Sequence, residues 1–199
     1  MKKLDDTRKL LGWKPTRQDL EAARTLTVRD LLAPGLKLLL VGINPGLYTA
    51  AVGHHFGRPG NRFWPALHAG GFTPRVYSPF EDESLLELGI GLTNVVPRAT
   101  SAESELAPEE LRAGGQALRR KLRRYRPRWV AFLGIGAYRG AFGLARAAAG
   151  RQPELLEGAG LWVLPNPSGL NAHYTLPRLA VMFRELREEI ERAGQVGPG

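Results

Sequence analysis

Short, almost wholly apolar segments recur along this chain, and each is followed by a stretch with helical character. The four segments are residues 36–41, 89–96, 129–133 and 161–164. Apolar runs of this length suit strands that are buried on both faces, as in parallel sheets. Strands that alternate with helices at this spacing predict an α/β domain, a three-layer sandwich with a central, mostly parallel sheet flanked by helices.

The intervening segments carry signals for the start of helices. Thr16 and Asp19 form a capping-box pattern, which predicts a helix that runs through Leu26. Pro108 followed by two glutamates suits the first turn of a helix, because acidic side chains stabilise the positive end of the helix dipole. The predicted helices of the main domain are residues 61–69, 108–125, 137–149 and 177–192.

The length of 199 residues fits one domain with a short extension. We expect a helical N-terminal extension (1–34), a main domain (35–193) and a flexible tail (194–199). The extension is expected to pack on the main domain or to bind beside it.

The charge balance and the composition limit the class of protein. Lys and Arg outnumber Asp and Glu by 28 to 19, a net charge of +9, which favours polyanions such as nucleic acid but equally fits a merely soluble basic protein. The absence of cysteine excludes disulfides, thiolate catalysis and zinc–cysteine sites. The charged start is not a signal peptide, and no apolar run reaches the roughly 18 residues of a membrane span. We therefore expect a cytoplasmic protein without a membrane partner.

Two loops carry the candidate chemistry, one after the first predicted strand and one after the last. The first contains Gly-Ile-Asn-Pro-Gly (42–46) and Gly-His-His-Phe (53–56), and the second contains Asn-Pro-Ser-Gly-Leu-Asn (166–171). In open parallel sheets, ligands bind beyond the carboxyl ends of the strands. The two loops can therefore face each other across a cleft, although about 120 residues separate them.

The residue types in these loops suit a flipped nucleotide. Asn44 offers a neutral amide that both donates and accepts, and Phe56 offers a flat face on which a base could stack. Leu170 is a bulky apolar tip that could wedge between base pairs, and Gly169 beside it permits close approach to a phosphate. Each loop by itself is also compatible with a plain turn.

Taken together, the two motifs resemble those of a known family. Residues 42–64, 89–98 and 166–171 are similar to the mismatch-specific uracil and thymine-DNA glycosylases of the uracil-DNA glycosylase superfamily. The resemblance extends from about Ala33 to Leu186, so the main domain would be the catalytic domain. It implies a DNA repair enzyme that flips uracil from mispairs such as G·U and hydrolyses the N-glycosidic bond. Thymine or etheno-type bases are further substrates that the resemblance leaves open. An abasic site would remain.

The resemblance also implies roles for individual residues. Asn44 would orient the hydrolytic water, and Phe56 would stack on the flipped base. The base edge would be contacted by the backbone at Gly42 and Ile43 and by Asn94, or alternatively by Thr93 or its neighbouring backbone. The segment that would enter the minor groove, with Leu170 filling the vacated space, comprises Asn166, Pro167, Ser168, Gly169, Leu170 and Asn171.

The sequence mixes features of two branches of that family. His54, His55 and Asn94 resemble the thymine-processing animal branch, whereas residues 166–170 resemble the bacterial mismatch-uracil branch. The choice among uracil, thymine and etheno adducts therefore stays open. One of the two adjacent histidines could touch the base or a phosphate, but both cannot easily face one site, so we expect no metal and no cofactor.

The chemistry expected from these residues depends on the leaving group. No Asp or Glu lies in the first loop, and an amide can orient water but cannot take its proton. We expect a monomer that acts on double-stranded DNA carrying mispaired uracil. A non-catalytic mismatch- or single-strand-binding protein would share the charge and the wedge. A phosphate-handling enzyme is disfavoured because the chain has no Walker or Gly-x-Gly-x-x-Gly motif.

A basic run near residues 119–128 is the densest positive segment, with six arginines and one lysine. It is typical of a solvated helix face, and nonspecific attraction to DNA is the alternative.

Overall fold

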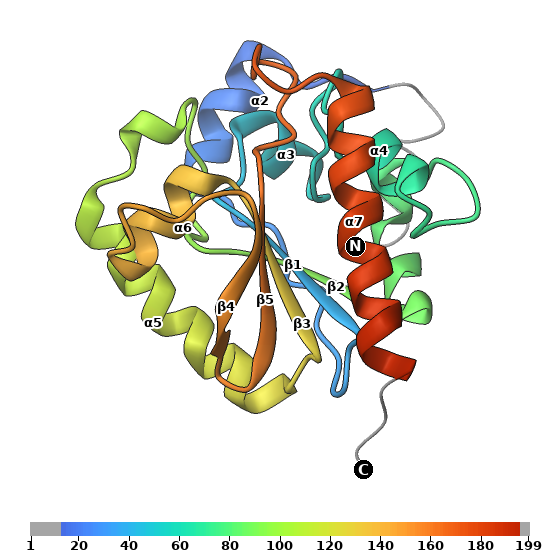
Figure 1. The fold of residues 1–199 in the computed structure, drawn as a ribbon. Coiled ribbons are helices and arrows are strands. Elements are labelled where there is room, and N and C mark those ends of the chain that lie inside the picture. Colours follow the sequence, from blue (N-terminus) through green and yellow to red (C-terminus); the bar gives the residue numbers. More distant parts are fainter. Residues whose placement is uncertain (1–12, 196–199) are drawn as a thin grey trace.

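The computed structural model describes residues 13–195, and its centre is a five-stranded sheet (Figure 1). The strand order is β2-β1-β3-β5-β4. Neighbouring strands are parallel except for the pair β4 and β5. The strands are β1 (Leu38–Gly42), β2 (Ile90–Asn94), β3 (Trp129–Leu133), β4 (Gly150–Leu156) and β5 (Ala159–Leu164).

Helices cover both faces of this sheet and give three layers (Figure 1). On one face lie α4 (Phe63–Ala69) and α7 (Leu176–Gln195), and on the other lie α5 (Pro108–Tyr125) and α6 (Ile135–Phe142). The predicted α/β sandwich with a mostly parallel sheet is confirmed.

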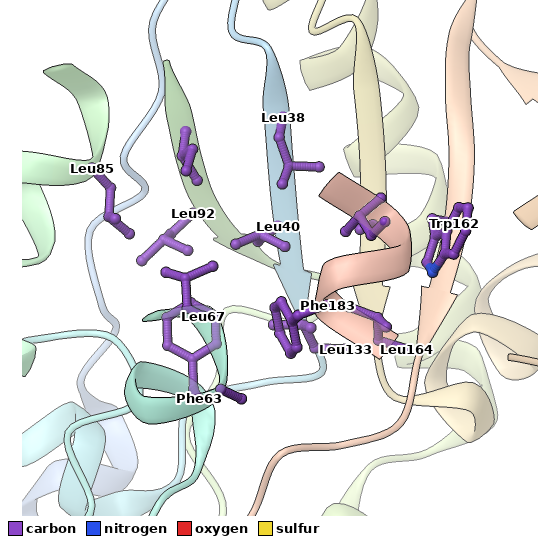
Figure 2. Packing of buried hydrophobic residues seen from close by; sticks show 14 of the residues in the cluster. Leu38, Leu40, Phe63, Leu67, Leu85, Leu92, Leu133, Trp162, Leu164 and Phe183 are labelled. Atoms are coloured by element: carbon purple, nitrogen blue, oxygen red, sulfur yellow. The ribbon is translucent and has the colours of Figure 1, made fainter. Parts of the chain in front are cut away.

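The alternation of side chains along β1 builds both halves of the core. Leu38 and Leu40 belong to the cluster that contains Phe63 and Phe183 from α4 and α7 (Figure 2). Leu39 and Val41 belong to the cluster on the α5 and α6 side. Successive residues of a strand point to opposite faces, so an unbroken apolar run is what a strand covered on both sides requires.

Most predicted elements are present, with differences at their ends. The helix 108–125 and the strand 129–133 are confirmed residue for residue. The helix predicted over 137–149 is α6, which starts at Ile135 and stops at Phe142, because Gly143 adopts a left-handed conformation with φ of 69°. Strand β4 was not predicted. Helix α7 continues to Gln195, two residues into the predicted flexible tail, and residues 196–199 lie outside the described residues.

The described part of the N-terminal extension packs on the domain. Helix α2 (Arg17–Ala22) starts with the predicted capping box of Thr16 and Asp19, and a short 3-10 turn, η1 (Ala23–Thr25), follows it. Leu31 then pairs with Leu92 of β2 in an antiparallel bridge. Residues 1–12 of the predicted extension lie outside the described residues.

Three further short helices shape the connections after β1 and β2. They are α3 (Leu47–Val52), η2 (Pro79–Leu88) and η3 (Glu103–Glu105). Between residues 13 and 195, no helix is both long enough and apolar enough to cross a membrane.

Candidate active site

A cleft of about 430 Å³ opens at the carboxyl ends of the parallel strands. The segments after β1, β2 and β5 all contribute to its walls, so the two loops predicted to face each other do meet. Backbone contact joins them directly, since the Arg62 N–H donates to the Pro167 carbonyl at 3.0 Å. Nine of the predicted site residues line the cleft: Gly42, Ile43, Asn44, Phe56, Asn94, Asn166, Ser168, Leu170 and Asn171.

Asn44 is held by one end of its side chain. Its Nδ2 donates to the Arg98 carbonyl at 2.9 Å, to the Thr100 hydroxyl at 2.7 Å and to the Pro45 carbonyl at 3.2 Å. Carbonyl oxygens only accept, so this environment fixes which end of the amide is nitrogen. The Oδ1 atom is the end left to accept a hydrogen bond from a molecule in the cleft.

Phe56 forms an aromatic wall of the cleft. Its ring stacks on the buried ring of Phe63, with centroids 3.9 Å apart and planes 21° from parallel. The Phe56 backbone has a positive φ of 53°, which is uncommon for a large residue. The direction of the ring therefore follows from the conformation of the loop backbone. The Phe56 ring, backed by Phe63, therefore presents a flat surface to the cleft.

Gly42 leaves room for the groups that close over it. A Cβ atom at this position would lie 2.5 Å from Asn94 Oδ1 and 3.6 Å from Phe56 Cζ. Any other residue here would push the Asn94 amide away. The glycine at the end of β1 thus allows the amide and the aromatic ring to sit together over the strand end.

Adjacent residues at the end of β2 have different surroundings. Asn94 lines the cleft, and its side-chain amide has no hydrogen-bond partner within residues 13–195. The Thr93 hydroxyl instead donates to Asp30 at 2.6 Å and accepts from Lys121 Nζ at 2.9 Å. Thr93 does not line the cleft that Asn94 lines, because neighbouring residues of a strand face opposite ways.

The backbone directly after β1 offers donors rather than free acceptors. The Gly42 and Ile43 carbonyls already accept hydrogen bonds from the Val95 and Val96 N–H groups, both at 2.9 Å. In the part of the chain that the structure describes, the Ile43 and Asn44 N–H groups donate to no other protein group. A base edge at this point would meet N–H donors.

Residues 166–171, here called the wedge loop, form a compact turn with an exposed tip. Within it, Asn166 Oδ1 accepts from the Ser168 N–H at 3.0 Å, and Asn171 Nδ2 donates to the Asn166 carbonyl at 3.0 Å. A Cβ on Gly169 would lie only 2.4 Å from the Gly60 carbonyl oxygen, so glycine lets the two loops touch. Leu170 is 72% exposed, an unusual position for a leucine. Pro167 is buried and does not line the cleft; its carbonyl joins the loop to Arg62.

The two adjacent histidines contact different carboxylate oxygens of Asp82, which is buried. His54 Nδ1 lies 3.1 Å from one Asp82 oxygen, and the His55 N–H donates to the other at 3.1 Å. Only His55 of the two lines the cleft. Its Nε2 lies 3.0 Å from the Arg29 carbonyl, which requires a proton on Nε2, and burial lowers the pKa of His55. Burial thus favours the neutral form of the ring.

Several cleft residues carry no signal in the local sequence. Thr100 binds Asn44, Arg58 lines the cleft, and Glu103 is the one acidic residue among the lining residues. Neighbouring protein atoms partly desolvate the Glu103 carboxyl, which raises its pKa. Among residues 13–195, no three His, Asp or Glu side chains come together in a group that could hold a metal ion.

The basic run begins in the second half of helix α5 and ends near the opposite edge of the sheet. Helix α5 begins after β2 and runs back toward the start of β3, where the Gly35 N–H donates to the Tyr125 carbonyl and the Arg128 N–H to the Leu36 carbonyl. Arg119 and Arg123 pair with Glu157, and Lys121 pairs with Asp30. This placement favours the solvated helix face over a contact with DNA held at the cleft.

Comparison with known proteins agrees with this architecture. The family model of the uracil DNA glycosylase superfamily matches residues 29–191. A protein from Methanosarcina acetivorans, solved in solution by NMR and provisionally named a uracil DNA glycosylase, has a similar fold. The two chains share 24% sequence identity with a TM-score of 0.53, over 81% of this chain and 98% of the other. The family model covers most of the chain, and the chain therefore belongs to the uracil DNA glycosylase superfamily.

Proposed function

We propose that the protein is a monofunctional, mismatch-specific DNA glycosylase that flips uracil out of mispairs such as G·U and hydrolyses its N-glycosidic bond. The observation that carries the proposal is Asn44, whose amide nitrogen is fixed by three acceptors while its oxygen is left to the cleft. A water molecule bound to that oxygen would be oriented toward the sugar of a base that lies against Phe56.

The cleft also suits the leaving group. Cleavage builds positive charge on the sugar and negative charge on the departing base, and fixed donors aimed at that charge lower the barrier. The free N–H groups of Ile43 and Asn44 and the unpartnered Asn94 amide are such donors. Uracil has carbonyl oxygens and a ring N–H along its edge, which an amide side chain can match as donor and acceptor at once.

Proton transfer is the step that Asn44 cannot perform, and this sets the proposed substrate preference. Asn44 can hold a water but cannot accept its proton at neutral pH. The reaction then depends on how readily the base departs, so uracil and other easily released bases are favoured over normal ones. Thymine and etheno adducts are the further candidate substrates.

Flipping needs a group that occupies the vacated space. Leu170 stands 72% exposed at the tip of a loop that borders the cleft. Unstacking and unpairing a base costs a few kcal/mol, least for a mispaired one, and an apolar wedge offsets part of that cost. All of these groups come from one chain, so we propose that the protein acts as a monomer on double-stranded DNA, without a cofactor.

Incubation with a duplex that carries one G·U pair tests the proposal. The protein should release free uracil and leave an abasic site that alkali converts to a strand break, without cleaving the strand itself. A matched G·C duplex should yield nothing. Tight binding of the G·U duplex with no release of uracil would instead identify a non-catalytic mismatch-binding protein.

A further inference from the structure

Arg62 joins the first loop to the wedge loop through backbone oxygens. It precedes α4 and is half-buried, and it makes one bond through its own N–H and four through its guanidinium. The backbone bond is to the Pro167 carbonyl at 3.0 Å. The guanidinium donates to the carbonyls of Asn171 (2.8 Å), Tyr174 (2.8 Å), Gly169 (3.1 Å) and Ser168 (3.5 Å).

These contacts give the wedge loop a support that its tip lacks. Leu170 is too exposed to be held by core packing, so the position of its side chain follows from the path of the loop backbone. Arg62 contacts the carbonyls on both sides of Leu170, those of Gly169 and Asn171. The guanidinium is a planar fork of five donors, a shape that lets one side chain hold several carbonyls at fixed positions.

The charge of Arg62 has no acidic partner. In the described part of the chain, no carboxylate lies within ion-pair distance of the Arg62 guanidinium, although 11 other Lys or Arg residues do form ion pairs. Its donors are directed to the loop carbonyls instead. An arginine used in this way stabilises the shape of the loop rather than the surface charge balance.

We propose that Arg62 is a positioning residue that holds the wedge loop in its inserting shape before DNA binds. The inference rests on the proposed function of Leu170 as the wedge. A loop that is already ordered does not lose conformational freedom on binding, so more of the contact energy remains available to keep the base flipped. Arg62 would then affect base release only through Leu170.

A direct contact between Arg62 and a phosphate is the competing explanation, and a lysine variant separates the two. Arg62→Lys keeps the positive charge but loses the fork, so one ammonium cannot span the same carbonyls. If charge were what mattered, Arg62→Lys would retain activity. If Arg62 acts by positioning the loop, Arg62→Lys should lose nearly as much activity as Arg62→Ala.

A double-mutant cycle with Leu170 provides the decisive measurement. Single-turnover release of uracil is compared between G·U duplex and single-stranded uracil DNA, for Arg62→Lys, Leu170→Ala and the double variant. Arg62→Lys should lower the duplex rate about 10-fold and leave the single-strand rate within about two-fold. In the Leu170→Ala background the same change should cost less than about two-fold, because the wedge it positions is already gone. A full additional loss in that background, or an unchanged duplex rate in Arg62→Lys, would overturn the proposal.

Arg187 supplies the matched control. It also donates to a backbone carbonyl next to α4, that of Gly70 at 3.1 Å, but at the other end of that helix. Arg187→Lys should leave the ratio of duplex to single-strand rates unchanged, even if the melting temperature falls. An equal drop in that ratio for Arg187→Lys would show that general loosening of α4 explains the effect of Arg62, and the proposal would fall.

Amide hydrogen exchange tests the positioning without any need for activity. The N–H groups of Ser168, Leu170 and Asn171 are all bonded inside the loop. In the free protein, Arg62→Lys should speed their exchange while the β1 amides stay protected, and Arg187→Lys should not. Loop amides that exchange no faster in Arg62→Lys would refute the proposal. A wild-type protein that released no uracil would refute the proposed function, whereas the exchange rates of the loop amides would still show whether Arg62 orders the loop.

Discussion

The Asn44 side chain presents its two ends to different surroundings, and that difference is the basis of the proposed chemistry. Its nitrogen is bonded to two backbone carbonyls and a threonine hydroxyl, and its oxygen accepts no hydrogen bond from residues 13–195. Phe56 and Asn94 close over Gly42 beside it. At this scale the sequence predicted the identity of the residues but not what fixes them, because Thr100 and Arg98 follow Asn44 by more than 50 positions.

Loss of the aromatic wall should weaken the hold on the flipped base. Phe56→Leu keeps an apolar side chain against Phe63 but removes the flat face, so it should cost roughly 1–3 kcal/mol of binding through lost stacking. The measurement is the affinity for a duplex that carries a non-cleavable uridine analogue. Phe56→Tyr is the control and should bind like the wild type; if Phe56→Leu did so too, the base would not stack there.

The Asn94 amide should set the preference for the base. Asn94→Ala should lower the rate of uracil release roughly ten-fold, the scale of one lost hydrogen bond. Thr93→Val is the matched control from the same strand, since its hydroxyl faces Asp30 and Lys121. Equal effects of the two changes on the rate would contradict the assignment of Asn94 to the base edge.

At the scale of elements, strands that are buried on both faces were easier to predict than the rest. β1, β2, β3 and β5 each contain an apolar run, whereas β4 is an edge strand that contains Arg151, Gln152, Pro153 and Glu154 and so resembles a loop. The link between Arg62 and the wedge loop was also invisible, because its acceptors are backbone carbonyls more than 100 positions away. A local sequence pattern specifies which residues face a core, and it does not record which loop lies next to another.

The wedge loop should matter only when there is a duplex to enter. Leu170→Ala should impair release from duplex G·U far more than from single-stranded uracil DNA, because a single strand has no stacked pair to replace. Rates on both substrates under single-turnover conditions measure this. An equal loss on both would indicate that the change disturbs the fold of the loop and not the insertion of a wedge.

At the scale of the whole molecule, the sheet brings three distant segments to one edge, and the basic run ends near the other. The segment after β2 is tied to α5 by the bidentate pair of Arg98 and Glu110, with bonds of 2.8 and 2.9 Å. The Arg98 carbonyl in turn holds Asn44. The fold class and the meeting of the loops were predictable, because parallel strands always end at a shared edge. The placement of α5's arginines away from the cleft followed only from the direction of that helix.

The pair of Arg98 and Glu110 should give stability a dependence on acid pH. The Arg98 guanidinium, together with the Ala107 N–H, lowers the pKa of Glu110 from 4.5 to about 2. A carboxyl with a depressed pKa in the folded state stabilises the fold above pH 4.5, and the benefit is lost as the pH falls toward about 2. Melting temperatures of the wild type and Glu110→Gln should therefore differ at pH 7 and converge near pH 2. A constant difference over that range would show that the ionised pair contributes nothing.

Asn44 is proposed to orient the hydrolytic water, and single-turnover release of uracil from a G·U duplex by Asn44→Ala measures that role. The variant should bind the duplex nearly as well as the wild type and release uracil more slowly by on the order of 10²-fold, the scale of one lost catalytic group. Release at the wild-type rate by Asn44→Ala would exclude Asn44 from this role.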